Sequence, residues 1–293
     1  MMRTLAAAAL ALAAMPGALQ AQYKVDEKRA ASPDGVVEIE NGAGSIKVIG
    51  WNRSEVAVTG TLGAGAEGLD FSGGPKKTRI EVETEGNPHG ISSDLEIHVP
   101  AGSRVEIESF AASVSVTDVT GTVSAEGVNN SIVITGAAKE VSAQTVNGSV
   151  EVTGAATRIH AESVNGPVTI KGAGGSVEAS TVNGRLSVAG GTFEHGSLET
   201  VAGGLRFEGD LARGAEIDAT TVSGGVEFVV PAGVSADFSI TTFSGDVQTD
   251  FGASAQRKSK HTTQKEVEFS TGEGDAKVSI QTLSGSIAVR KRP

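Results

Sequence analysis

The decapeptide TVNGSVEVTG, Thr145–Gly154, indicates the fold because the chain repeats it. The same phrase returns eighteen residues later as SVNGPVTIKG, residues 163–172, and again as TVNGRLSVAG, residues 181–190. A sequence that repeats at a short fixed period is typical of a solenoid, in which each repeat forms one coil that stacks on the next. The repeat therefore predicts an elongated stack of coils.

The last residue of each TVNG-like unit marks the predicted turn of its coil. Successive turns are 18 residues apart over four steps and then 19, 21, 21 and 40 residues apart, and the last interval fits two coils of which one is degenerate. Glycine, or asparagine in its place, suits a bend that needs positive φ. This turn column consists of Ala112, Asn130, Gly148, Gly166, Gly184, Gly203, Gly224, Gly245 and Gly285.

A row of asparagines stands directly before the turn column. Because neighbouring coils stack at the spacing of strands in a sheet, about 4.8 Å, each side-chain amide lies within reach of the next. We expect these amides to hydrogen-bond along the stack as a ladder. The asparagine ladder consists of Asn129, Asn147, Asn165 and Asn183.

Residues on both sides of each turn alternate between apolar and polar. Val150 and Val152 follow one turn, and the equivalent positions in the other units are mostly β-branched. Alternation with a period of two predicts half-buried strands, so we expect both valines to point inward. A second alternating stretch, such as residues 158–162, completes the coil. The predicted fold is all-β: a single-chain parallel β-solenoid, or β-helix, with coils of about 18 residues, right-handed like nearly all β-crossover-β connections.

The segments outside the repeat set the predicted domain boundaries. Residues 1–21 carry Arg3, an Ala/Leu run and then small residues, which is the order of a secretory signal peptide. Trp51 is expected to cover the N-terminal end of the stack, because an uncovered coil is a pairing edge. The other predicted segments are a linker at 22–35, the solenoid at 36–290 with regular repeats over about 109–209 and loop insertions at 62–94 and 252–265, and a basic tail at 291–293.

The composition limits the class of partner. The chain has 24 basic and 35 acidic residues, and its net charge of −11 becomes −12 once Arg3 leaves with the signal segment. Nucleic acid and anionic lipid both need a basic face, so neither is expected as a partner. The sequence has no cysteine, and no segment after the signal is apolar enough to cross a membrane. We therefore expect burial and strand pairing alone to hold the exported chain together.

One basic segment, residues 252–265, interrupts this acidic chain. Its cationic residues are Arg257, Lys258, Lys260, His261 and Lys265. Two interpretations stay open, a solvated hairpin tip and an electrostatic contact for an anionic envelope polymer. Elsewhere charged and neutral residues alternate from coil to coil along one column, which is expected to keep carboxylates off neighbouring coils. That column runs through Glu126, Gln144, Glu162, Ser180 and Glu199.

None of the residue patterns typical of catalysis occurs. Metal-ligand spacing is missing among the histidines, which are His89, His98, His160, His195 and His261. The aspartates are spread thinly, whereas glycoside cleavage needs a carboxylate pair at a defined separation. A column of threonines at 145, 181, 200, 221, 242 and 282 has some likeness to an ice-binding face, but Gly127 and Ser163 interrupt it. We predict a protein that is not an enzyme and uses no cofactor and no metal.

Three stretches together resemble the bacterial putative-adhesin family of envelope β-solenoids, domain of unknown function 4097. They are DLEIHVPAGSRVEIES at 94–109, the repeated SVNG and TVSG units, and VSIQTLSGSIAVR at 278–290. The resemblance covers roughly residues 36–290. It implies a parallel β-solenoid at the cell envelope, and it transfers no catalytic or ligand residue to this chain.

The predicted function is a binding, adhesion-type or structural module of the bacterial cell envelope. The chain is expected to be exported to the periplasm, the outer surface or the medium, where its partner is an unidentified envelope polymer or protein. Three alternatives stay open. The first is a self-assembling envelope scaffold, which would show as self-association, the second a partner in envelope-stress signalling, and the third a glycan-active enzyme.

Overall fold

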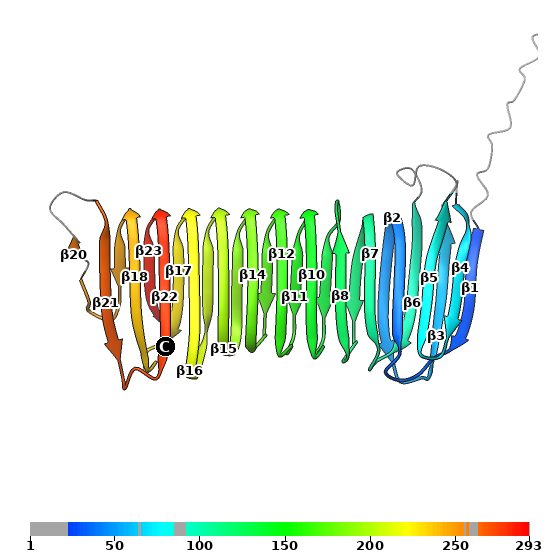
Figure 1. The fold of residues 1–293 in the computed structure, drawn as a ribbon, viewed down its shortest axis with the longest axis horizontal. Coiled ribbons are helices and arrows are strands. Elements are labelled where there is room, and N and C mark those ends of the chain that lie inside the picture. Colours follow the sequence, from blue (N-terminus) through cyan, green and yellow to red (C-terminus); the bar gives the residue numbers. More distant parts are fainter. Residues whose placement is uncertain (1–22, 64–65, 85–91, 255, 258–262, 293) are drawn as a thin grey trace, which may run out of the picture.

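The computed structural model describes residues 23–63, 66–84, 92–254, 256–257 and 263–292, and the regular structure in these ranges is entirely β-strand. The strands stack side by side into one long body of two layers (Figure 1). They are β1 (Tyr23–Ala30), β2 (Val36–Trp51), β3 (Glu55–Leu62), β4 (Ala66–Gly74), β5 (Lys77–Thr84), β6 (Ser93–Pro100), β7 (Arg104–Thr117), β8 (Thr122–Gly127), β9 (Ile132–Thr135), β10 (Glu140–Asn147), β11 (Val150–Thr153), β12 (Arg158–Asn165), β13 (Val168–Lys171), β14 (Gly175–Asn183), β15 (Leu186–Ala202), β16 (Leu205–Ser223), β17 (Val226–Pro231), β18 (Ala236–Ser244), β19 (Val247–Thr249), β20 (Gln256–Arg257), β21 (Lys265–Thr271), β22 (Ala276–Ser284) and β23 (Ile287–Arg292).

Each regular coil contributes one longer and one shorter strand. The longer strands β8, β10, β12 and β14 pair in parallel and form what we call the long-strand face. The shorter strands β9, β11 and β13 pair in parallel on the opposite layer, the short-strand face. Glu140 lies beside Arg158 and Arg158 beside Ser176, so equivalent residues of successive coils are in register. The predicted all-β solenoid is confirmed, and its handedness stays a prediction.

The core lies between the two faces. Val150 and Val152 are 1% and 3% exposed, which confirms that this alternation points inward. Small aliphatic side chains fill most of the length, but larger rings fill the C-terminal third. Phe193, Phe207 and Phe228 are fully buried, and their ring centroids are 5.1 and 4.5 Å apart in succession. Burial of these apolar side chains is the main source of stability, because the chain has no disulfide.

The turn glycines are needed for close approach, and the prediction that this column supplies positive φ is wrong for most of it. Gly224 alone in the column has a positive φ, of 159°, among the residues described. A Cβ built on Gly148 would lie 1.7 Å from the carbonyl oxygen of Asn130 in the preceding coil, and one on Gly166 would lie 1.8 Å from that of Gly148. No side chain fits at such distances. Positive φ occurs instead at the opposite corner, at Gly136, Gly154, Gly172 and Gly190.

Polar side chains around the turn column bond from coil to coil. Asn147 donates to Asn129, Asn165 to Asn147 and Asn183 to Asn165, each over 2.9 Å between Nδ2 and Oδ1. On the inner side, the hydroxyls of Ser163 and Thr181 donate to the carbonyls of Gly148 and Gly166 at 2.8 and 2.9 Å. Each coil therefore satisfies polar groups of the coil before it.

The N-terminal end differs from the predicted linker, loop and tryptophan cap. Residues 22–35 contain β1, which pairs antiparallel with β3, and the predicted insertion at 62–94 contains β4 and the start of β6. Within this insertion, the alternation at 78–84 predicts β5 alone. β2 pairs with β5 and β6 on one side and with β7 on the other, so Trp51 belongs to an interior coil. Its Nε1 donates to the Glu55 carbonyl at 2.8 Å and its ring lies 4.8 Å from that of His98. Strands β1, β3 and β4 cover the end instead.

At the C-terminal end the last coil in sequence is not the last coil in space. β22 pairs with β16 and β18, and β23 pairs with β17 and β19, so this coil lies between the two that precede it in the chain. The described part of the 40-residue interval before Gly285 therefore contains no degenerate parallel coil. It includes β20 and β21, and β21 pairs antiparallel with β18 at the end of the stack (Figure 1).

The predicted basic tail is part of the sheet. Lys291 and Arg292 extend β23 beside Val230 and Pro231 of β17. Arg292 also forms an ion pair with Asp210 at 2.6 Å. The chain end is thus fastened to a strand far earlier in the sequence.

Candidate binding surface

Outward side chains of the long-strand face form straight rows across the strands. One of them, the carboxylate row, has a carboxylate on each of five adjacent strands, β4, β5, β2, β7 and β8. Its members, in spatial order, are Asp70, Glu81, Glu40, Glu108 and Glu126. Beyond Glu126 the row continues through Gln144, where the alternation with neutral residues begins. The alternation predicted for the column from Glu126 to Glu199 is present in register. It does not extend to the N-terminal end, because strands distant in sequence are inserted there.

Arg79 partly compensates this like-charge row. Its guanidinium lies 3.0 Å from a carboxylate oxygen of Glu40 and 2.8 Å from one of Glu81. Burial nevertheless raises the pKa of Glu40, and the charges of Glu81 and Glu108 raise it further against the opposing effect of Arg79. The carboxylate row thus holds more negative charge than its own cations neutralise.

Two open grooves lie on the long-strand face, one near each end. The N-terminal groove has a volume of about 570 Å³ and contains four residues of the carboxylate row. Its lining residues are Glu40, Asn41, Gly42, Glu81, Val82, Thr84, Glu108, Ser109, Phe110, Glu126, Gly127 and Val128. It therefore has one acidic wall and one that is largely apolar.

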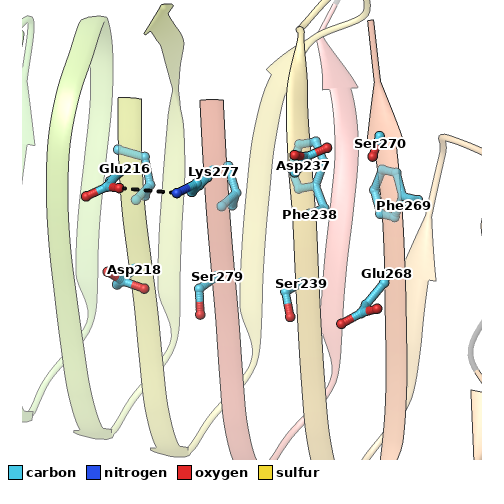
Figure 2. Close-up of a pocket in the computed structure, with 12 residues that line it drawn as sticks. Glu216, Asp218, Asp237, Phe238, Ser239, Glu268, Phe269, Ser270, Lys277 and Ser279 are labelled. Carbon is cyan, nitrogen blue, oxygen red and sulfur yellow. Dashed lines mark ion pairs between the residues drawn. The ribbon is translucent and has the colours of Figure 1, made fainter. Parts of the chain in front are cut away.

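The C-terminal groove, of about 620 Å³, lies across β16, β22, β18 and β21. Figure 2 shows its polar side chains in two rows, Glu216, Lys277, Asp237 and Ser270 in one and Asp218, Ser279, Ser239 and Glu268 in the other. Lys277 forms an ion pair with Glu216 at 3.8 Å. Because the side chains stand side by side on separate strands, they offer an extended contact surface and do not converge on one point.

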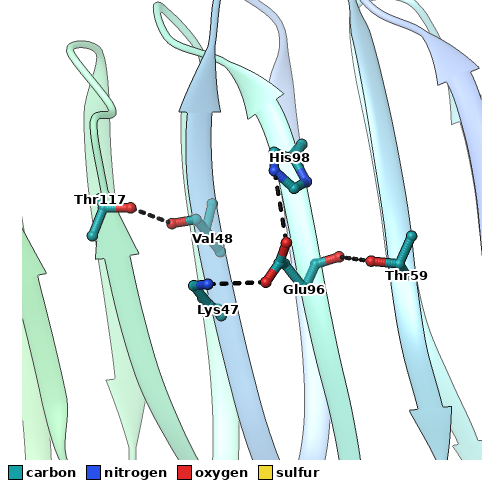
Figure 3. A network of polar contacts seen from close by, with 6 residues as sticks. All are labelled: Lys47, Val48, Thr59, Glu96, His98 and Thr117. Carbon is teal, nitrogen blue, oxygen red and sulfur yellow. Dashed lines mark hydrogen bonds and ion pairs between the residues drawn. The ribbon is translucent and has the colours of Figure 1, made fainter.

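The short-strand face carries mixed charges that pair locally. Lys47 lies 2.9 Å from Glu96 on the neighbouring strand, and His98 lies 3.8 Å from the other oxygen of that carboxylate (Figure 3). The hydrogen bond from Lys47 lowers the pKa of Glu96. Hydroxyls of Thr59 and Thr117 donate to nearby backbone carbonyls of neighbouring strands. These polar groups of the short-strand face therefore pair with one another.

Two of the five cations of the predicted polymer contact lie within the described residues. Lys258, Lys260 and His261 lie outside the described residues, and Arg257 belongs to β20. Lys265 begins β21 and forms an ion pair with Asp246, which lowers the pKa of that carboxyl. Among the five cations, the described side chain of Lys265 is thus engaged within the chain.

Among the described residues, the histidines and the threonine column considered in the sequence analysis do not come together in one site. His160 lies between Glu162 and Glu178 at 3.6 and 3.3 Å, and His195 is exposed on β15. Within the described ranges no three histidine, aspartate or glutamate side chains could hold a metal ion. The threonine column is buried and points into the core, as Thr181 at 3% exposure illustrates, so it forms no ice-binding face. His89 lies outside the described residues.

Sequence reasoning missed an exposed apolar row. The residue before each ladder asparagine is a valine, and Val146, Val164 and Val182 are 40%, 41% and 39% exposed. Strand alternation was the available signal, because Thr145 and Ala143 point inward and Val146 must therefore point outward.

The stacked coils place the protein in the class of β-solenoids. The profile of the Toastrack family, DUF4097, matches residues 72–290, and the chain belongs to that family. The part of the chain that the structure describes includes no helix long and apolar enough to cross a membrane.

Several solved structures align with nearly the whole chain. A putative adhesin from Bacteroides fragilis aligns at 10% identity over 93% of this chain and 99% of its own, with a TM-score of 0.47. One from Parabacteroides distasonis aligns at 10% identity over 93% and 98%, with a TM-score of 0.45. A putative cell adhesion protein from Clostridium sporogenes aligns at 12% identity over 92% and 100%, with a TM-score of 0.22. No curated protein matches the sequence.

Proposed function

We propose that the chain is a non-enzymatic binding module, exported to the bacterial cell envelope, where it contacts an envelope polymer or protein. The observation that supports this proposal is the long-strand face. It presents straight outward rows at strand spacing, about 4.8 Å, between a groove of about 570 Å³ and one of about 620 Å³. An extended partner can contact many equivalent positions on such a surface at once.

The arrangement of polar groups favours binding over catalysis. Catalysis needs an acid, a base or a nucleophile held in contact with one reacting atom. In the C-terminal groove, Asp218 and Glu268 stand on strands separated by β22 and β18, so their spacing follows the sheet (Figure 2). No observation specifically favours a glycan-active enzyme or a stress-signalling partner.

End-to-end assembly of a scaffold is less well supported than binding. Continuation of the parallel coils from one chain into the next requires a parallel coil at each end of the stack, with unpaired backbone groups on its edge. Both ends of this stack carry antiparallel pairs, β1 with β3 and β4 with β5 at one end and β18 with β21 at the other. The outermost strand β1 also has the charged sequence YKVDEKRA, and such charges blunt an edge against further pairing.

For an anionic polymer, the candidate contact is the basic segment 252–265. It follows β19 at the C-terminal end of the stack and continues into β21. Because Lys265 is already paired with Asp246, we assign the contact to the cations before it. Counter-charge attraction of this kind weakens as salt rises.

Co-sedimentation of the purified exported chain tests the proposal. The chain is mixed with washed bacterial envelopes, or with isolated envelope polysaccharide, over a salt series. We expect saturable pelleting that falls with salt and falls further in the double variant Lys258→Ala/Lys260→Ala. The control Lys24→Ala/Lys28→Ala removes two cations from β1 at the opposite end and should pellet normally. Equal loss in both variants would refute the assigned contact, and no pelleting at any salt would refute the polymer-binding function.

A further inference from the structure

An apolar row runs along one edge of the long-strand face. Its members, in spatial order, are Phe110, Val128, Val146, Val164, Val182, Val201, Val222, Leu283 and Phe243. Eight of the nine are exposed, and the only other exposed large hydrophobic side chain in the described residues is Tyr23. Nine strands at about 4.8 Å spacing make the row about 38 Å long.

The strand does not itself require an apolar side chain at this position. Outward positions two and four residues earlier on the same strands are polar, as Gln144 and Ser142 show beside Val146. Leaving a continuous line of valines in water has a cost that serine or threonine there would avoid. A contiguous exposed apolar surface on a soluble body is typical of an interaction site.

The two flanks of the apolar row differ in charge. The asparagine ladder on one side is neutral, and its amides bond to one another. The other flank lies two residues before the apolar positions and is acidic from β7 to β15, where glutamates alternate with neutral residues, and neutral beyond. In spatial order it consists of Glu108, Glu126, Gln144, Glu162, Ser180, Glu199, Thr220, Gln281 and Thr241. At the N-terminal groove the apolar and carboxylate rows meet, because Phe110 and Val128 line the same hollow as the carboxylates. The surface is therefore apolar with one acidic border.

We propose that this surface docks a cationic amphipathic helix of a partner protein. The apolar face of the helix would lie on the apolar row, with lysine or arginine side chains along one border against the carboxylates. The dimensions agree, since a helix advances 5.4 Å per turn, close to the strand spacing, and about 25 residues at 1.5 Å each span the row. This partner is a cationic protein segment on the long-strand face, whereas the anionic polymer considered above is assigned to the basic segment 252–265.

Charge complementarity favours such a helix over a second copy of the chain. The net charge of the chain is −11, and each copy would bring its own acidic border to the interface. Like charges brought together in this way disfavour association. A cationic helix would instead bring opposite charge to Glu108 and Glu126, the two members of the carboxylate row that border the apolar row.

Peptide binding tests the proposal directly. The probe is a fluorescent 24-residue amphipathic helix of leucine and lysine, titrated with the purified chain and followed by anisotropy. One comparison peptide has the same composition in scrambled order, and another has glutamate in place of lysine. We expect binding of the first peptide alone and a weakening with salt, because the attraction is partly electrostatic.

Substitutions in the chain separate the apolar row from general charge. Val164→Thr/Val182→Thr/Val201→Thr keeps β-branched side chains on the strands and should weaken binding about tenfold. Val133→Thr, a half-buried position on the short-strand face, should change nothing. Unchanged affinity of the triple variant, or equal binding of the scrambled peptide, would overturn the proposal. So would a dimer in sedimentation equilibrium that the triple variant dissociates, because it would identify a second copy as the occupant.

Discussion

Gly166→Ala tests whether close approach of neighbouring turns accounts for the turn glycines. The added Cβ would lie 1.8 Å from the carbonyl oxygen of Gly148 and 2.6 Å from its carbonyl carbon. An ordinary carbon–oxygen contact is about 3.3 Å or longer, so the two turns must separate by roughly 1.5 Å. Both turns are held by parallel strand pairs on either side, which resist such a shift.

The expected cost is at the upper end of that for overpacking, about 3 kcal/mol. For a domain of this size, each kcal/mol corresponds to roughly 2–4 °C in Tm, so we expect a decrease of about 6–12 °C. Backbone strain does not enter, because Gly166 has no positive φ. The cost arises mainly from the contact between coils, since the nearest atom of its own coil, Ser163 Oγ, is 3.1 Å away.

Gly233→Ala is the matched control, because its Cβ would have no atom within 4 Å and its φ is not positive. We expect it to leave stability unchanged or raise it by about 0.4–1 kcal/mol, since alanine restricts the unfolded chain. Thermal and urea unfolding of both variants, followed by circular dichroism, give the comparison. Equal stability of the two variants would refute the close-approach explanation.

Three further predictions concern the core, the charged rows and the chain end. Val150→Asp places a charge at a side chain 1% exposed and should cost about 3–5 kcal/mol in urea unfolding; an unchanged midpoint would show that this column does not face the core. The raised pKa of Glu40 means that its contribution to stability is present at acid pH and lost as pH rises through the folded-state pKa. Glu40→Gln should therefore raise Tm at pH 7 but not at pH 3. The carboxyl of Glu96 has a lowered pKa, so Glu96→Gln should lower Tm at pH 7 and lose that effect as pH falls. Tm shifts of the same sign in both variants at pH 7 would contradict this assignment. Arg292→Ala removes the partly exposed ion pair with Asp210 and should lower the free energy of unfolding by about 0.5–1 kcal/mol. Backbone hydrogen exchange in β23 should become faster in this variant. Exchange as slow as in the unaltered chain would show that the ion pair does not hold β23 in place.

The structure of the regular middle of the stack could be predicted from the sequence because its strands pair with strands of the next coil along the chain. Each coil pairs with the next one along the chain, so the repeat that aligns Val150 with Val168 in sequence also aligns them in space. Strand alternation then shows which residues face the core, and it should have shown that Val146 does not. The sequence predicts the positions of the turn glycines correctly, but not the reason for them. A repeated glycine shows that no side chain is tolerated, without showing whether positive φ or the close approach of a neighbouring turn excludes it.

The repeat and the strand alternation were sufficient to predict the all-β stack and its inward columns. Tertiary structure decided the order of the coils at both ends, where β2 lies between β6 and β7 and β23 lies between β17 and β19. Alternation fixes the face of a strand but not its neighbour, because many parallel edges present the same backbone hydrogen-bonding groups. The uninterrupted carboxylate row, with its acidic groove, exists only because that order brings together glutamates far apart in the chain.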